Sequence, residues 1–102
     1  MAYTIIVEER AKADIRAAAL WMAQYSPEKA TLWHFEIEDA ILSLEKMPNR
    51  CPRARESQFF KQEVRHLILG KYRILFTVED ETIRILHVRH SAQDYWRPDD
   101  DE

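Results

Sequence analysis

The sequence predicts an α+β protein: an N-terminal strand, an antiparallel two-helix hairpin and a three-stranded antiparallel meander, together forming one sheet. Three observations predict it. A short β-branched and aromatic run opens the chain, two long segments then carry apolar residues at helical spacing, and three strand-like segments with short connections close it. We expect antiparallel strands throughout, with the helices on one face of the sheet and the other face available for function.

The first strand is predicted at residues 3–7, and an alanine-rich helix follows at residues 10–25. Ser26 then suits a helix N-cap and Pro27 the first helical position, so a second helix is predicted at residues 27–46. The connection is so short that the helices must lie antiparallel. Two stripes are expected to face the core: Ala11, Ile15, Ala18, Ala19 and Met22 on the first helix, and Trp33, Ile37, Ala40, Leu44 and Met47 on the second.

Residues 49–61 lack any hydrophobic period and are predicted to be a connecting loop. Strands are predicted at residues 64–69, 72–78 and 82–90. Gly70, the only glycine, is expected to adopt a positive φ between the first two. Alternation on the last strand would place Ile83 and Ile85 on one face and Leu86 and Val88 on the other. Both faces would then be apolar, so we expect a partner to cover the second face.

The chain has 102 residues, which suits a single domain at residues 1–98 followed by an acidic tail at residues 99–102. The formal net charge is −3, which lacks the positive excess of a non-specific nucleic-acid binder. One cysteine, Cys51, and no signal-like or membrane-spanning stretch are consistent with the cytoplasm. We expect no cofactor and no metal: one glycine permits no phosphate-binding loop, and the spacing of His87 and His90 puts them on opposite faces of a strand.

The order of elements and three sequence segments resemble the RelE/ParE superfamily, the toxins of bacterial type II toxin–antitoxin modules, also called plasmid stabilisation proteins. The segments are MPNRCPRARE, EVRHLILGKYRILFTV and IRILHVRH, and the most informative motif is Gly70-Lys71-Tyr72-Arg73 followed by an apolar strand and a final Val-Arg-His. The resemblance covers nearly the whole chain. It implies a cognate antitoxin as partner, no contact with a membrane, and binding to operator DNA only through that antitoxin.

The resemblance leaves two mechanisms open. RelE-like members are metal-independent ribonucleases that cleave mRNA on the ribosome, and such cleavage needs a base, an acid and a cation for the charged phosphorane. Arg73 matches the arginine of these nucleases, and His66, His90 and Tyr95 would complete a catalytic set. Two of them have a simpler interpretation: Arg73 would pair with a carboxylate, and His90 would bond to a loop carbonyl.

ParE-like members inhibit DNA gyrase and are not known as nucleases. The nearly neutral chain and the absence of lysine from residues 64–69 favour this second mechanism, so the chain is expected to be a toxin rather than an enzyme. A non-toxic binding or autoregulatory module of the same fold is a third possibility. The side chains expected to meet partners are basic or aromatic: Arg65, Arg73, Arg89, His90, Tyr95 and Trp96.

Overall fold

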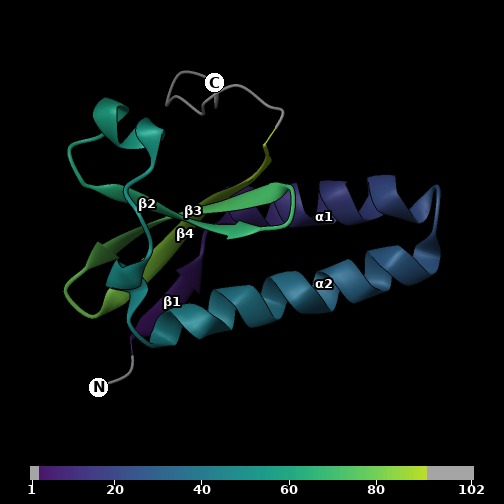
Figure 1. Cartoon of the computed structure of the whole chain (residues 1–102), viewed down its shortest axis with the longest axis horizontal. Helices are drawn as coiled ribbons and strands as arrows, with labels where there is room; N and C mark the ends of the chain where they lie inside the picture. Colours follow the sequence, from purple (N-terminus) through teal and green to yellow (C-terminus); the bar gives the residue numbers. More distant parts are fainter. Residues whose placement is uncertain (1–2, 92–102) are drawn as a thin grey trace.

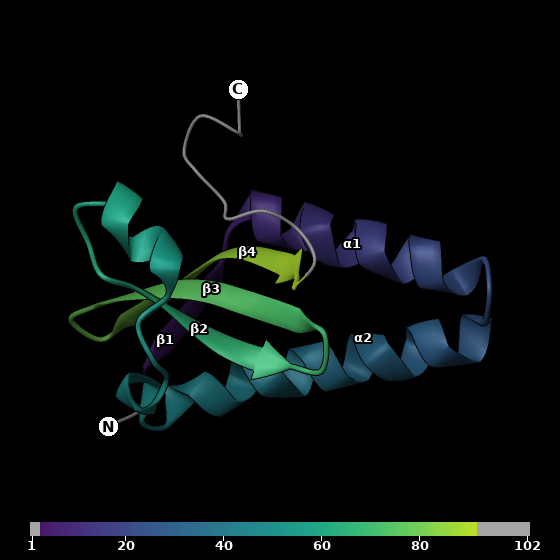
Figure 2. The same ribbon diagram turned by 45° about the horizontal axis from the view of Figure 1, so that its top comes forward.

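The computed structural model describes residues 3–91, in which two helices pack against one face of a four-stranded sheet (Figure 1). The sheet has the strand order β1-β4-β3-β2. In chain order the elements are β1 (Thr4–Val7), α1 (Glu9–Ala23), α2 (Pro27–Leu42), β2 (Val64–Leu69), β3 (Tyr72–Glu79) and β4 (Thr82–His90). Figure 2 shows α1 and α2 lying alongside one another and extending past the end of the sheet. The predicted α+β architecture is confirmed.

The pairing of β1 differs from the prediction, because β1 runs parallel to β4, with Thr4 opposite Thr82 and Val7 opposite Ile85. The sheet is therefore mixed, and only β2, β3 and β4 form an antiparallel meander. The antiparallel expectation assumed short connections. The helical hairpin and two strands separate β1 from β4 along the chain, and so long a crossover allows either direction.

A β-bulge corrects the predicted faces of β4. The register shifts between Leu75 and Phe76 of β3, which lie opposite His87 and Ile85, so that Leu86 is the additional residue. An additional residue reverses the alternation that follows it. Val88 consequently joins Ile83 and Ile85 in the main core instead of facing away from them.

The main core lies between the sheet and the helical hairpin. Most of the predicted stripe is buried there, including Ala11 and Ile15 of α1 and Trp33 and Ile37 of α2. Met47 does not belong to it: its side chain is 74% exposed, because α2 ends at Leu42 and Met47 itself has a positive φ of 53°. The helix start is as predicted, since the Ser26 Oγ accepts a hydrogen bond from the Lys29 N–H, and Gly70 has the expected positive φ of 58°.

The second face of the sheet is partly covered by the chain itself. Between α2 and β2 lie three short 3₁₀ helices, of which η3 (Arg55–Phe59) sits over the face away from α1 and α2 (Figure 1). A second cluster forms beneath it, with Ala54, Val64 and Leu75 buried and Phe60 and Leu86 packed against them. The predicted partner is therefore not needed to cover this apolar area.

Asp14 ties α1 to the open edge of β4. Its Oδ2 atom accepts a hydrogen bond from the Val88 N–H at 3.0 Å and lies 2.6 Å from the His87 Nδ1. These groups lie beyond Ile85, the last residue of β4 that pairs with β1. A helix carboxylate thus occupies part of the strand edge that β1 leaves uncovered.

Candidate functional site

Arg73 stands on β3 on the sheet face that η3 covers, and its side chain is only 12% exposed. Its terminal nitrogens donate to both carboxylate oxygens of Glu56, the Nη1–Oε1 distance being 3.1 Å. The Glu56 side chain is 0% exposed. Such a two-pronged arginine–carboxylate pair is the strongest kind of side-chain ion pair, and it satisfies the donors that would otherwise bind a phosphate.

The position of Glu56 follows from the way η3 is anchored to β2. The Ala54 N–H donates to the Val64 carbonyl at 2.7 Å, and the Val64 N–H donates to the Ser57 Oγ at 2.9 Å. These two bonds flank Glu56 and hold it above β3. Ala54, two residues before Glu56, is itself buried in the second cluster.

Among residues 3–91, His66 is the only other predicted catalytic residue that lies beside Arg73. Its Nδ1 lies 3.2 Å from the Arg73 Nη1, so the imidazole accepts from the guanidinium. Burial lowers the pKa of His66 below its ordinary value of 6.5, and the positive charge of Arg73 lowers it further, against a smaller opposing effect of Glu56. His66 is therefore neutral at physiological pH.

His90 lies away from this cluster. It is opposite Tyr72 in the β3–β4 register, and the two rings form an edge contact with centroids 5.2 Å apart. Tyr72 in turn packs against Trp33 of α2 at 5.0 Å, on the helical side of the sheet. Arg73 and His90 therefore face opposite sides. Tyr95, Trp96 and the tail at residues 99–102 lie outside the described residues.

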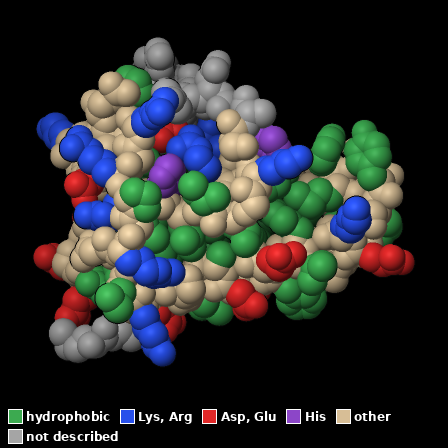
Figure 3. Space-filling view, in the orientation of Figure 1, with side chains coloured by type: hydrophobic (Ala, Val, Ile, Leu, Met, Phe, Trp, Pro, Cys, Tyr) green, Lys and Arg blue, Asp and Glu red, His purple; other side chains and the backbone are tan. Residues whose placement is uncertain are grey.

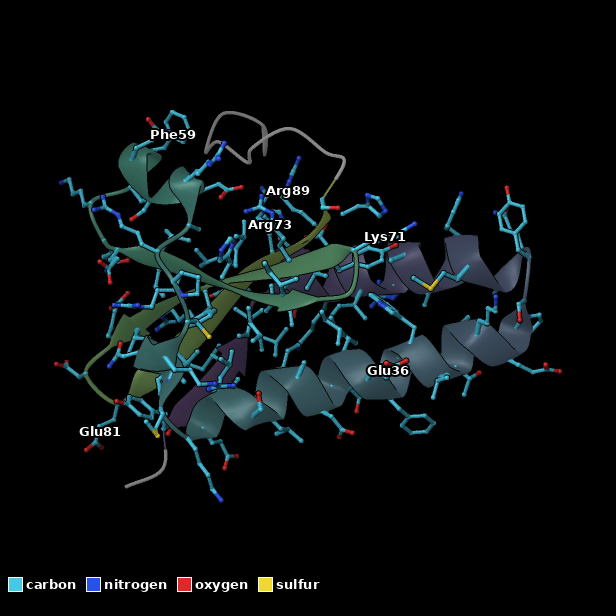
Figure 4. All side chains as sticks on the ribbon, viewed as in Figure 1. Glu36, Phe59, Lys71, Arg73, Glu81 and Arg89 are labelled. Atoms are coloured by element: carbon cyan, nitrogen blue, oxygen red, sulfur yellow. The ribbon has the colours of Figure 1, made fainter. Side chains whose placement is uncertain are left out.

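The other basic residues predicted to meet partners have different surroundings. Arg65 contacts the carbonyls of Asn49 and Cys51 and lies 2.7 Å from the Glu63 carboxylate, so it ties β2 to the preceding loop. Arg89 lies opposite Arg73 in the register and so shares its face (Figure 4). Of the predicted partner-binding residues within the described range, Arg73 and Arg89 are thus the two that lie together on one face of the sheet.

Cys51 has the environment of a structural residue. Its side chain is buried in the main core, and burial raises the pKa of its thiol above the ordinary value, with Arg50 and Arg65 opposing the shift.

Within residues 3–91 no three metal-ligating side chains gather at one point. In the same range, no helix combines the length and apolarity that crossing a bilayer requires.

A second candidate surface is an apolar groove of about 890 Å³ along the seam between α1 and α2. Small side chains such as Ala19, Ala23 and Ala30 line it, flanked by the large side chains of Leu20 and Phe35, which are 64% and 62% exposed. Figure 3 shows hydrophobic side chains gathered over the helical hairpin and basic ones over the sheet. The titratable lining residues divide by helix: Lys12 and Arg16 lie on α1, and His34 and Glu38 lie on α2.

Sequence reasoning missed both Glu56 and the groove. Glu56 lies in a loop without periodicity, and nothing in its neighbourhood marks it as the partner of an arginine 17 residues later. The sequence did contain an indication of the groove. Leu20, Phe35 and Leu42 are large apolar residues off the predicted core stripes, and all three line it.

The fold is that of type II toxin–antitoxin toxins. Similar structures include the chromosomal ParDE toxin–antitoxin system of P. aeruginosa, at a TM-score of 0.70 and 24% identity, covering 87% of this chain and 96% of that one. The RelBE2 toxin–antitoxin complex of Mycobacterium tuberculosis has a TM-score of 0.57 and 22% identity, covering 88% and 99%. No curated protein sequence matches the chain significantly.

The sequence itself gives the family. Residues 5–95 match the ParE toxin of the type II toxin–antitoxin system parDE, so nearly the whole chain is covered. The chain belongs to the ParE toxin family, within the RelE/ParE superfamily that its motifs resemble.

Proposed function

We propose that this toxin inhibits DNA gyrase, does not cleave RNA, and is neutralised in the cytoplasm by a cognate antitoxin. The observation that carries the proposal is the pairing of Arg73 with the buried Glu56. A nuclease of this fold would use Arg73 to stabilise a phosphorane, and this requires a guanidinium whose donors can reach the phosphate. Here a desolvated carboxylate of the same chain occupies them.

The rest of the catalytic set supports the same proposal. His66 is neutral and accepts from Arg73, so it is suited to holding the arginine in place. His90 packs against Tyr72 on the opposite side of the sheet and cannot act on a phosphate bound at Arg73. Of the predicted catalytic residues that the structure describes, His66 alone joins Arg73 on its face, so these two residues do not supply both an acid and a base there.

For the gyrase contact we propose the end of β4, with Arg89 and His90 in the described structure and Tyr95 and Trp96 following in the chain. Arg65 and Arg73, which were predicted to share this role, pair with Glu63 and Glu56. The end of β4 is preferred because the aromatic Tyr95 and Trp96 follow it in the chain, and Tyr, Trp and Arg are common interface anchors. If Arg65 or Arg73 left its pair to contact another protein, Glu63 or Glu56 would lose its counter-charge. The energetic cost would be largest for Glu56, which is fully buried.

For the antitoxin we propose the groove between α1 and α2. Its size and apolar lining fit one face of an amphipathic helix, and exposed groove residues such as Leu20 and Phe35 offer anchors for it. Lys12 and Arg16 on the α1 side favour a helix with acidic residues along that edge. The RelBE2 structure of similar fold is a toxin–antitoxin complex, and it supports an antitoxin as the partner.

Induction of the chain in a bacterial host tests the proposal. We expect filamentation and a DNA damage response while protein synthesis continues at first, and relief when the neighbouring small reading frame is co-expressed. Immediate translation arrest with cleaved mRNA would instead support the ribosome-dependent nuclease. A folded chain without any growth defect would support a non-toxic module.

A further inference from the structure

Positive charge gathers in the loop between α2 and β2, although the chain as a whole has a negative net charge. Residues 50–61 contain one acidic side chain, Glu56, and four exposed basic ones, which we call the basic loop cluster: Arg50, Arg53, Arg55 and Lys61. Glu56 is wholly buried and paired with Arg73, so the exposed charge of this segment is entirely positive. The net charge of −3 therefore conceals a local surface of the opposite sign.

The fold brings this loop against β2, where it meets a further arginine. An isolated bridge pairs Arg53 with Arg65, so two arginines lie directly opposite one another. Arg65 also donates to two carbonyls of the loop, on either side of Arg50. Like charges that lie opposite each other on paired strands are destabilising, and an anion relieves the repulsion. Glu63, 2.7 Å from Arg65, compensates one of the two charges.

The charges of the basic loop cluster are not neutralised by the described part of the chain at three of its positions. Within residues 3–91, neither Arg53 nor Lys61 forms an ion pair with a carboxylate. Arg50 is held by uncharged oxygens, at 3.0 Å from the Lys46 carbonyl and 3.2 Å from the Ser43 Oγ. These bonds order the guanidinium and leave its positive charge in place. The loop thus presents cations that a polyanion can approach from solvent.

We propose that the basic loop cluster binds the phosphate backbone of duplex DNA. Exposed arginine and lysine side chains neutralise backbone phosphates and give affinity that does not depend on base sequence. A duplex is favoured because proteins that bind single strands stack successive bases on aromatic rings. In this segment Phe60 packs into the second cluster, and Phe59 is only 37% exposed.

The choice of DNA over RNA rests on the proposed function, because gyrase holds DNA while it acts. η3, which carries Arg55, covers one face of the sheet, and Arg89 at the end of β4 faces the same side (Figure 4). The DNA contact would therefore add to the protein contact proposed at the end of β4. It would favour association of the toxin with gyrase that has already bound DNA.

Fluorescence anisotropy of a short labelled DNA duplex, titrated with the native chain in the absence of gyrase, tests the proposal. For four phosphate contacts, the logarithm of the association constant should fall with the logarithm of the salt concentration at a slope of about −4. Lys61→Gln should make this slope shallower by about one, and Arg53→Gln/Lys61→Gln by about two. The double variant should also bind roughly tenfold more weakly at low salt.

Lys29→Gln is the matched control, because Lys29 is an exposed lysine near the start of α2, on the helical hairpin. It should bind the duplex as the native chain does. All substituted side chains are exposed, and circular dichroism verifies that each variant is folded. Three results would each overturn the proposal: equal losses in Lys61→Gln and Lys29→Gln, no binding by the native chain at low salt, or tighter binding to single-stranded or duplex RNA.

A supercoiling assay with the same proteins separates this inference from the proposed function. DNA binding by a native chain that does not inhibit gyrase would refute the proposed target and support the DNA contact. Inhibition of gyrase by a native chain that binds no DNA would refute the DNA contact alone.

Discussion

Glu56 and Arg73 form a buried two-pronged ion pair that joins the loop helix η3 to the central strand β3. Each charge depends on the other. An isolated carboxylate or guanidinium at this depth would lack the solvent that stabilises it elsewhere, so the pair is maintained by the fold as a unit. This relationship governs both the stability of the loop and the chemistry open to the sheet face beneath it.

Replacing Arg73 by alanine should lower the free energy of unfolding by about 3–5 kcal/mol, because the buried Glu56 carboxylate is left without its counter-charge. The double variant Glu56→Gln/Arg73→Gln should be less destabilised than the sum of the two single variants, since neither side chain then carries a charge. Urea unfolding measures the free energy of unfolding of the native chain, of both single variants and of the double variant.

The control is Arg84, whose pair with Glu8 spans 3.1 Å and is about two-fifths exposed on both sides. Arg84→Ala should cost no more than about 1 kcal/mol, because solvent screens exposed pairs. Equal losses for Arg73→Ala and Arg84→Ala would contradict the assignment of a desolvated pair.

His66 should make the stability of the chain depend on pH below about neutrality. Burial and Arg73 lower its pKa in the folded state below the ordinary 6.5. Above pH 6.5 the side chain is neutral in both the folded and the unfolded state, and it contributes fully to the free energy of unfolding. As the pH falls below that value, the His66 side chain is protonated first in the unfolded chain. Its contribution to the free energy of unfolding therefore decreases until the pH reaches the pKa of the folded state.

The measurement is urea unfolding of the native chain and His66→Asn at pH 7.5 and 5, pH values chosen to bracket the ordinary pKa on both sides by about one unit or more. The native chain should lose more stability over this interval than the variant, whose side chain does not titrate. The same loss in both proteins would show that His66 is not shielded as described.

Trp33 and Trp21 provide a matched comparison on the helical hairpin. Trp33 is 9% exposed and packs against Tyr72, whereas Trp21 is 57% exposed. Trp33→Ala should cost about 3–5 kcal/mol through the cavity that it leaves, and Trp21→Ala about 1 kcal/mol or less. Chemical denaturation monitored by circular dichroism tests this, and a larger loss at Trp21 would mean that the helices pack on a different face.

The groove between α1 and α2 can be tested by charge insertion. Leu20→Asp and Phe35→Asp change exposed side chains, so both proteins should fold, yet each should weaken antitoxin binding at least about tenfold by placing a carboxylate in the apolar contact. Calorimetry with the antitoxin encoded next to the toxin gives the affinities.

Leu32→Asp is the matched control, since Leu32 is 60% exposed on the same hairpin but does not line the groove. It should bind like the native chain. A loss at Leu32 equal to the loss at Phe35 would locate the antitoxin elsewhere on the helices.

The sequence predicted those elements whose signals are local. The Ser26-Pro27 helix start, the single Gly70 turn and the apolar stripe through Trp33 and Ile37 each depend on neighbours within a turn or two, and each is confirmed. The exit of α2 was placed too late, because Met47 continues the apolar spacing although the backbone has already left the helix.

Features that depend on contacts between residues far apart in the sequence had no comparable indication in the sequence. The parallel direction of β1 depends on its pairing with β4, far away in the sequence, and the bulge at Leu86 is defined only by the register of β4 against β3. A carboxylate partner was one of the two interpretations of Arg73 that the sequence left open, but its identity as Glu56 depends on how an aperiodic loop folds back over the sheet.

The central claim is that the toxin acts on gyrase without using Arg73 as a catalytic group. The most direct measurement adds purified Glu56→Gln/Arg73→Gln, shown to be folded, to DNA gyrase with supercoiled DNA and, separately, to translating ribosomes with a defined mRNA. We expect the native and double-variant chains to inhibit gyrase alike, and we expect neither to cleave the mRNA. Cleavage by the native chain that disappears in the double variant would contradict it.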